Sequence, residues 1–105
     1  HKLNNLCVIV DYNKLQSLET VELTLGLEPF EEKWKSFGWD VLKVNGHSHQ
    51  EIYKALKVKK NKPFCLIADT VKGKGVSFME NQVLWHYRSP QEKEYESALK
   101  EIIDA

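Results

Sequence analysis

FCLIAD, residues 64–69, is a nearly unbroken apolar run that ends in an aspartate and leads to a Gly-Lys-Gly turn at residues 73–75. A short apolar run of this kind is typical of a strand covered on both faces, as in a parallel sheet. Leu6–Asp11 (LCVIVD) repeats the pattern, whereas Asp40–Val44 (DVLKV) is shorter and more mixed. We therefore expect three strands, with Asp40–Val44 nearer an edge of the sheet.

Three helices are expected between and after these strands, and each has a recognisable start. Pro29 opens the first, which ends before Gly38, while capping boxes open the second at Ser48 and the third at Ser89. Residues 16–28 have weaker patterning and predict a loop with a helical turn. The side chains predicted to face inward are Phe30, Trp34, Phe37, Ile52, Tyr53, Leu56, Tyr95, Ala98, Leu99, Ile102 and Ile103. Strands alternating with helices predict an α/β fold, a parallel sheet with flanking helices.

Composition and charge narrow the class of protein. Fifteen basic and fifteen acidic residues give a formal charge of zero, so no global field favours nucleic acid or an anionic membrane. The apolar runs are too short to span a bilayer, and the start has no signal-peptide layout. Cys7 and Cys65 both lie in apolar runs, which predicts buried thiols in neighbouring strands and a reducing compartment. A cytoplasmic location is the resulting expectation.

The segment after the last strand carries the residues most suited to an anion. Gly73 and Gly75 free the backbone of the turn, Lys72 and Lys74 supply positive charge, and His86 follows downstream. Together they suggest a diphosphate-bearing cofactor beyond the carboxyl ends of the strands. A plain turn with solvated lysines is the alternative, because the spacing fits neither a Walker A loop nor a GxGxxG site.

Four phrases of the sequence carry a resemblance that covers essentially the whole chain. They are VIVDYNKLQS, EKWKSFGWDVLKVNGH, TVKGKGVSFMENQVLWHYRSP and EYESALKEI. The chain resembles transketolase, and most of all the separately encoded N-terminal section, or subunit, of split bacterial transketolases. The resemblance implies that residues 1–105 are the C-terminal half of the domain that binds the diphosphate of thiamine diphosphate.

The resemblance also implies roles for single residues. Asn13 matches the asparagine whose side-chain oxygen ligates the cation, usually Mg²⁺ or Ca²⁺, and Leu15 matches a ligand through its main-chain carbonyl. His86 matches the histidine near the diphosphate and the reacting centre, and so the expected catalytic residue. Lys72 falls beside the cofactor, where a diphosphate contact is expected. Taken alone, Asn13 would indicate only an Asx turn, and His86 only a loop histidine packed beside Trp85.

The sequence departs from the family pattern in one important respect. It contains no Gly-Asp-Gly, and only twelve residues precede Asn13. The metal-binding aspartate, the N-terminal histidines and the pyrimidine-binding domain with its glutamate are therefore absent from this chain. We expect a fragment that is inactive alone and that needs a C-terminal section or second subunit, in a homo-oligomer or heterotetramer.

The resemblance implies transfer of a two-carbon ketol unit between sugar phosphates by the whole enzyme. Two alternatives stay open at this point. One is a fragment of an enzyme like 1-deoxyxylulose-5-phosphate synthase, which shares the Lys-Gly-Lys-Gly turn. The other is a non-catalytic α/β binding or assembly module, which the missing Gly-Asp-Gly would favour.

Overall fold

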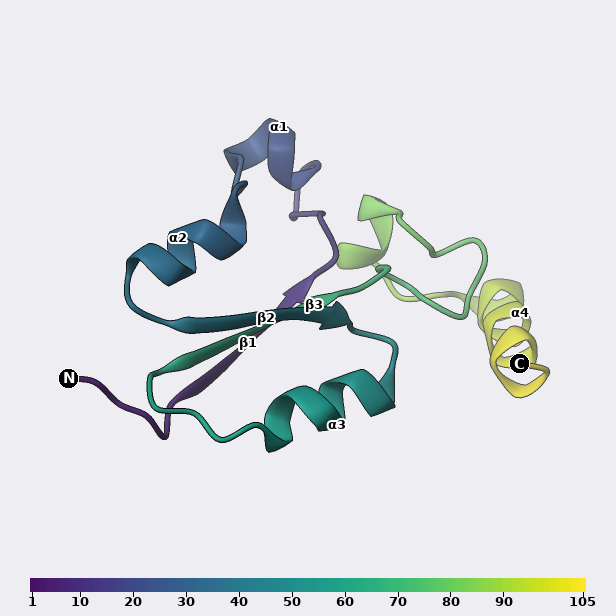
Figure 1. The fold of residues 1–105 in the computed structure, drawn as a ribbon. Helices are drawn as coiled ribbons and strands as arrows, with labels where there is room; N and C mark the ends of the chain where they lie inside the picture. Colours follow the sequence, from purple (N-terminus) through teal and green to yellow (C-terminus); the bar gives the residue numbers. More distant parts are fainter. The chain divides into compact units, whose positions relative to one another are not determined.

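The computed structural model describes residues 1–105 and contains two compact units (Figure 1). The first unit comprises His1–Tyr12 and Gly26–Thr70, and the second comprises Asn13–Leu25 and Val71–Ala105. The chain thus leaves the first unit after Tyr12, returns to it at Gly26, and leaves it again after Thr70. None of the helices is long and apolar enough to span a bilayer.

A three-stranded parallel sheet forms the centre of the first unit. Its strands are β1 (Cys7–Tyr12), β2 (Asp40–Asn45) and β3 (Phe64–Asp69), in the order β1-β3-β2. Cys7 and Asp40 both pair with Phe64, so the three strands start in register. The predicted fold class, a parallel sheet with flanking helices, is confirmed.

Two helices of the first unit cover opposite faces of this sheet (Figure 1). They are α2 (Phe30–Ser36), which leads into β2, and α3 (His49–Lys57), which follows it. The chain crosses from β1 to the far edge at β2 and then returns to the centre at β3. Two right-handed crossovers in opposite directions place their helices on opposite faces.

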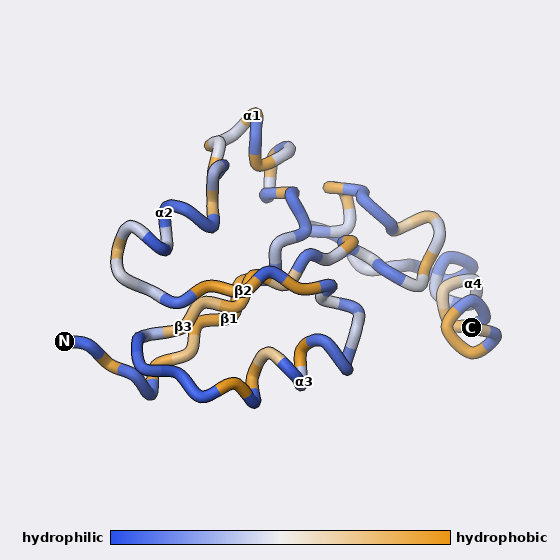
Figure 2. Tube along the Cα trace, viewed as in Figure 1, coloured by the Kyte–Doolittle hydropathy of each residue, from blue (hydrophilic) through white to orange (hydrophobic).

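The core of the first unit is built around β3. Hydrophobic colour runs along the three strands in Figure 2, and Phe64–Ala68 are all buried. On the face covered by α3, Phe64 and Leu66 pack with Ala55, and Val44 and Ile52 close the cluster. A central strand buried on both faces explains why the apolar run of residues 64–69 is unbroken.

The prediction that Leu6–Asp11 is covered on both faces is wrong. In β1 the alternate residues Cys7, Ile9 and Asp11 are exposed, and Ile9 has 57% of its surface accessible. β1 lies at an edge of the sheet, and α3 packs over β2 and the central strand instead. Cys65 is therefore a buried thiol and Cys7 is not, although the two thiols do lie in neighbouring strands.

The second unit contains α1 (Val21–Leu25), the short 3₁₀ helix η1 (Val83–His86) and α4 (Glu92–Ile103). The helical turn predicted within residues 16–28 is α1. The predicted start of the last helix is wrong by two positions, since its N-cap is Gln91 and its capping box joins Gln91 to Glu94. Glu94 also pairs with Arg88, which holds the carboxylate at the later position.

The inward-facing pattern predicted for the helices is only partly correct. Phe30 and Trp34 contact each other in α2, Ile52 of α3 packs against the core cluster of the first unit, and Ala98 is buried in α4. Seven other side chains of the prediction are exposed: Phe37, Tyr53, Leu56, Tyr95, Leu99, Ile102 and Ile103. The periodicity marks an apolar stripe, but it cannot show whether another element covers that stripe.

Candidate cofactor and metal site

The loop that follows β1 holds the two predicted metal ligands in a fixed geometry. The Leu15 N–H donates to Asn13 Oδ1 at 2.9 Å, which is an Asx turn. Leu15 and Thr20 form a β-bridge, closed by hydrogen bonds from Gln16 N–H to the Glu19 carbonyl and from Val21 N–H to the Lys14 carbonyl. Both hydrogen bonds of the bridge are made by the neighbours of Leu15 and Thr20. The Leu15 carbonyl oxygen therefore takes no part in the bridge.

This loop fits a hard divalent cation as a partial ligand set. An amide oxygen has two lone pairs, so Asn13 Oδ1 can bind a cation while it accepts the Leu15 N–H. Asn13 Oδ1 and the Leu15 carbonyl are both oxygen donors of the kind that Mg²⁺ and Ca²⁺ require. No group of three or more His, Cys, Asp and Glu side chains could hold a metal ion in this chain. Phosphate oxygens and water are the further ligands that such a cation would accept.

The Gly-Lys-Gly turn that follows β3 is closed by its own backbone. Val76 N–H donates to the Gly73 carbonyl, and Asn81 N–H donates to the Lys72 carbonyl at 3.0 Å. Gly73 has φ +73°, and a Cβ placed there would lie 2.6 Å from the Met79 carbonyl oxygen. Gly73 is therefore required for the close approach of residues 79–81 to the turn.

The two lysines of this turn differ in availability. Lys74 Nζ lies 3.3 Å from Glu80 Oε1, and the Gly75 N–H donates to the same oxygen at 3.2 Å. Lys72 is half-buried and makes no ion pair within the chain. Of the two, Lys72 is therefore the one whose ammonium group can meet a diphosphate without first leaving a carboxylate.

His86 is the last residue of η1, and it lies against the loop that carries Asn13 and Leu15. Its Nε2 is 3.0 Å from Ser17 Oγ, and its ring contacts that of Tyr87 edge-on, with centroids 5.1 Å apart. The Tyr87 hydroxyl donates to the Ser17 carbonyl. Trp85 instead packs on Phe78 and donates to the Phe78 carbonyl at 3.1 Å.

The second unit therefore contains all four predicted site residues. His86 contacts Ser17, which belongs to the same loop as Asn13 and Leu15, and no hydrogen bond or ion pair joins the Lys72 side chain to the other three. Ser17 was not predicted, because it lies in the weakly patterned segment and no spacing or motif distinguishes a loop serine from its neighbours.

The strand ends of the first unit form a polar network of their own. Thr70 Oγ1 donates to Asp11, and Lys43 lies 3.9 Å from Asp69. The ends of β1 and β3 therefore lie side by side. Tyr12 donates to Glu28 Oε1 at 2.9 Å, and burial and this carboxylate raise the pKa of Tyr12 to about 12.

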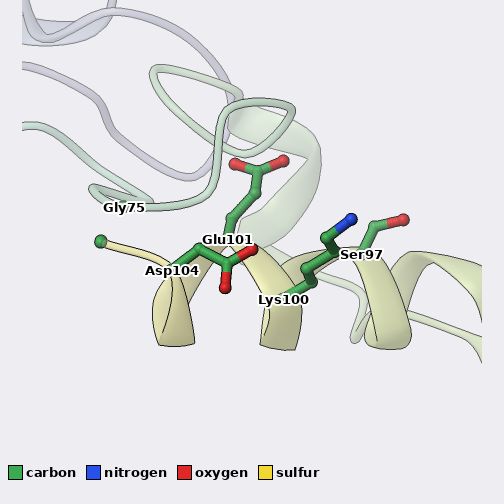
Figure 3. A pocket seen from close by; sticks show the side chains of 6 residues that line it. Gly75, Ser97, Lys100, Glu101 and Asp104 are labelled. Atoms are coloured by element: carbon green, nitrogen blue, oxygen red, sulfur yellow. The ribbon is translucent and has the colours of Figure 1, made fainter.

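The second unit also contains a depression beside α4 (Figure 3). It is lined by Gly75, Ser97, Lys100, Glu101, Asp104 and Ala105. The Glu101 side chain reaches toward the turn in Figure 3, where Ser77 Oγ donates to it at 2.8 Å. Two carboxylates make this depression unsuited to a diphosphate.

The sequence matches the family described as transketolase, thiamine diphosphate binding domain, over residues 1–102. An apulose-4-phosphate transketolase subunit from Phocaeicola vulgatus is 41% identical over an alignment of 105 positions, which covers 97% of this chain and 37% of that protein. The 6-deoxy-6-sulfo-D-fructose transketolase subunit SqwG of Clostridium sp. (strain MSTE9) is 36% identical, over 96% of this chain and 38% of that protein.

Full-length transketolases are also similar to this chain. Human transketolase is 32% identical over 97% of the chain and 16% of its own length. The crystal structure of transketolase from Campylobacter jejuni superposes with a TM-score of 0.89 at 32% identity, over 97% of this chain and 16% of that one. The chain thus spans between 16% and 38% of the length of these relatives.

Proposed function

This chain belongs to the family of transketolase thiamine diphosphate-binding domains, and from that membership we propose that it is part of a transketolase that moves a two-carbon ketol unit between sugar phosphates. The observation that carries the proposal is the contact between Ser17 and His86, because it joins the histidine to the loop with both metal-ligand candidates.

Each site residue has a distinct task in this proposal. Asn13 Oδ1 and the Leu15 carbonyl would hold Mg²⁺, or Ca²⁺, and the cation would supply positive charge to the diphosphate of thiamine diphosphate. The Lys72 ammonium group neutralises diphosphate charge. When bound, the cofactor supplies the carbanion chemistry of ketol transfer.

His86, the last residue of η1, contacts Ser17 in the loop that carries Asn13 and Leu15. One ring nitrogen faces Ser17, so the other is left to donate to a diphosphate oxygen or to move a proton at the reacting centre. The side chain is exposed in this chain, which leaves it accessible to a cofactor.

The remaining metal ligands must be supplied from outside residues 1–105. Two relatives are named as subunits of a transketolase, one acting on apulose-4-phosphate and one on 6-deoxy-6-sulfo-D-fructose. We therefore propose a partner subunit or further section that completes the site, within a cytoplasmic homo-oligomer or heterotetramer. Both names describe ketoses that carry an anionic group, a phosphate in one and a sulfonate in the other. Sugar phosphates are the substrate class that we propose for the whole enzyme, and this chain alone is expected to be inactive.

The metal role is tested by Asn13→Ala in the full protein that contains this chain. Loss of a ligand should weaken Mg²⁺-dependent binding of thiamine diphosphate by at least about tenfold. Asn45→Ala is the matched control, since Asn45 Oδ1 forms the same turn after β2 by accepting the His47 N–H at 2.9 Å. If both variants keep the parent's Mg²⁺ dependence, Asn13 is not a metal ligand.

The role of His86 is tested by the rate of ketol transfer. His86→Ala should lower turnover by roughly 10²–10⁴-fold if the ring moves a proton, with the Mg²⁺ dependence of cofactor binding retained. His49→Ala, at the exposed start of α3, should turn over like the parent. An active His86→Ala variant would remove the histidine from the mechanism and leave the metal assignment in place.

A further inference from the structure

Ser17 is tied to the segment of His86 at both of its polar ends. Its hydroxyl oxygen lies 3.0 Å from His86 Nε2, and its carbonyl accepts the hydroxyl of Tyr87. Ser17 itself lies at the tip of a tight turn, closed by the 2.8 Å hydrogen bond from Gln16 N–H to the Glu19 carbonyl. The serine is thus held in place independently of the histidine.

The His86 ring has one edge left for a ligand. Tyr87 packs edge-on against it at an interplanar angle of 81°, and Ser17 occupies Nε2. Nδ1 is the remaining polar atom of the ring. No carboxylate pairs with His86, so the serine hydroxyl is the polar side-chain group that meets the ring, and a hydroxyl can either donate to Nε2 or accept from it.

The tautomer decides what Nδ1 can offer. A neutral imidazole has one N–H, and the other nitrogen is an acceptor. If Nε2–H donated to Ser17, Nδ1 would present a lone pair, which repels the lone pairs of an anion. If the serine hydroxyl donates to Nε2, the proton lies on Nδ1, and the ring presents a hydrogen-bond donor to an anionic oxygen.

We infer that Ser17 is a positioning residue for His86: its hydroxyl donates to Nε2, keeps the proton on Nδ1, and so makes the ring a donor to a diphosphate oxygen. The identity of the anion rests on the proposed function. The choice of the Nδ1–H tautomer rests on it as well, because the ring has to offer a donor to that anion, whereas the pairing of Ser17 with His86 does not.

The tautomer is measured directly by ¹⁵N NMR of histidine-labelled full protein without cofactor, with the His86 signals assigned from a His86→Gln variant. The parent should hold the proton on Nδ1. Ser17→Ala should shift the ratio of tautomers toward Nε2–H by about three- to tenfold, the range that one net hydrogen bond supports. Ser17→Thr keeps the hydroxyl and should restore the parent's ratio.

Ser97→Ala on the exposed face of α4 is the matched control and should leave the His86 signals unchanged. Tyr87→Phe removes the hydrogen bond to the Ser17 carbonyl but leaves the Ser17 hydroxyl in place. This variant should keep the proton on Nδ1. A parent protein with its proton on Nε2, or a Ser17→Ala variant with an unchanged ratio, overturns the inference.

Cofactor titration then separates this inference from the proposed function. Ser17→Ala should weaken thiamine diphosphate binding about three- to tenfold, and Ser17→Thr should not. A full protein that binds no thiamine diphosphate, yet shows the Ser17-dependent tautomer, overturns the proposed function and supports the Ser17–His86 pairing.

Discussion

Tyr12 ties the end of β1 to the start of α2, directly before the metal-ligand candidate Asn13. The side chain is 6% exposed, and its hydroxyl donates to Glu28 Oε1. The second oxygen of Glu28 accepts the Phe30 N–H at 2.9 Å, and these two donors lower the pKa of Glu28. One tyrosine and one carboxylate thus fix where the strand ends and the helix begins.

The pH dependence of stability should reveal this contact. Because the pKa of Tyr12 rises from 10.0 to about 12 on folding, the protonated phenol is favoured in the folded state. Its contribution is complete below pH 10.0 and is lost as the pH rises through about 12. Tyr12→Phe should lower the free energy of unfolding by about 1 kcal/mol at neutral pH.

Urea unfolding across this alkaline range provides the measurement. The parent should lose stability more steeply than Tyr12→Phe, and its advantage at neutral pH should vanish as the pH rises toward about 12. Burial also raises the pKa of the Cys65 thiol to about 11, but this group is present in both proteins and cancels. Parallel curves would show that the Tyr12 hydroxyl has no such role.

The turn between β3 and η1 depends on its two glycines for different reasons. Gly73 and Gly75 both have positive φ, at +73° and +95°. A Cβ at Gly73 would meet the Met79 backbone, whereas a Cβ at Gly75 would meet nothing within 4 Å. An alanine at Gly75 would therefore show the cost of backbone strain alone, and an alanine at Gly73 would show that cost together with a steric clash.

Gly75→Ala should lower the free energy of unfolding by about 1–2 kcal/mol, the strain of a left-handed alanine. Gly73→Ala carries the same strain and also displaces residues 79–81, so its loss should be larger. It should also weaken thiamine diphosphate binding, since Lys72 is anchored to Asn81 through the displaced backbone. Chemical unfolding and cofactor titration of both variants give the comparison, and equal effects would contradict the role of the Met79 contact.

Local sequence signals predicted the elements well where the determinant is itself local. The Ser48 cap accepts the Glu51 N–H as expected, and Gly38 follows the Phe37 C-cap with φ +82°. Ser89 failed as a cap because Glu94, paired with Arg88, favours Gln91 instead. Both residues have a glutamate three positions later, but serine is the preferred N-cap, so the sequence favours the position that the structure does not use.

Burial was harder to predict than structure type because it depends on what packs across from each residue. The apolar run of β1 resembles that of β3, but only β3 lies between two other strands. The site shows the same limit. The family resemblance predicts Asn13, Leu15, Lys72 and His86, and these roles stay predictions, while Ser17 enters only through its contact with His86.

The chain as a whole should not bind its cofactor tightly. Its metal-ligand candidates are the Asn13 side chain and the Leu15 carbonyl, and no carboxylate cluster adds to them. Since Mg²⁺ favours six oxygen ligands, residues 1–105 alone should show no Mg²⁺-dependent binding of thiamine diphosphate at low-micromolar affinity, which would require about 8 kcal/mol. Calorimetric titration of this chain, beside the full protein as a positive control, tests the expectation. Tight binding by the chain alone would contradict an incomplete site.

The strand order also affects the sequence in which the chain can fold. Pairing Cys7 with Phe64 closes a loop of more than half the chain, whereas pairing Asp40 with Phe64 closes less than half of that separation. The longer closure loses more chain entropy, by an amount below about 1 kcal/mol, and contacts of high sequence separation form late. We expect β2, α3 and β3 to assemble first and β1 to join last.

Val8→Ala in β1 should then speed unfolding with little change in the folding rate. A folding rate that falls instead would show that β1 joins early. Asn13, which directly follows β1, would reach its place only when folding is nearly finished.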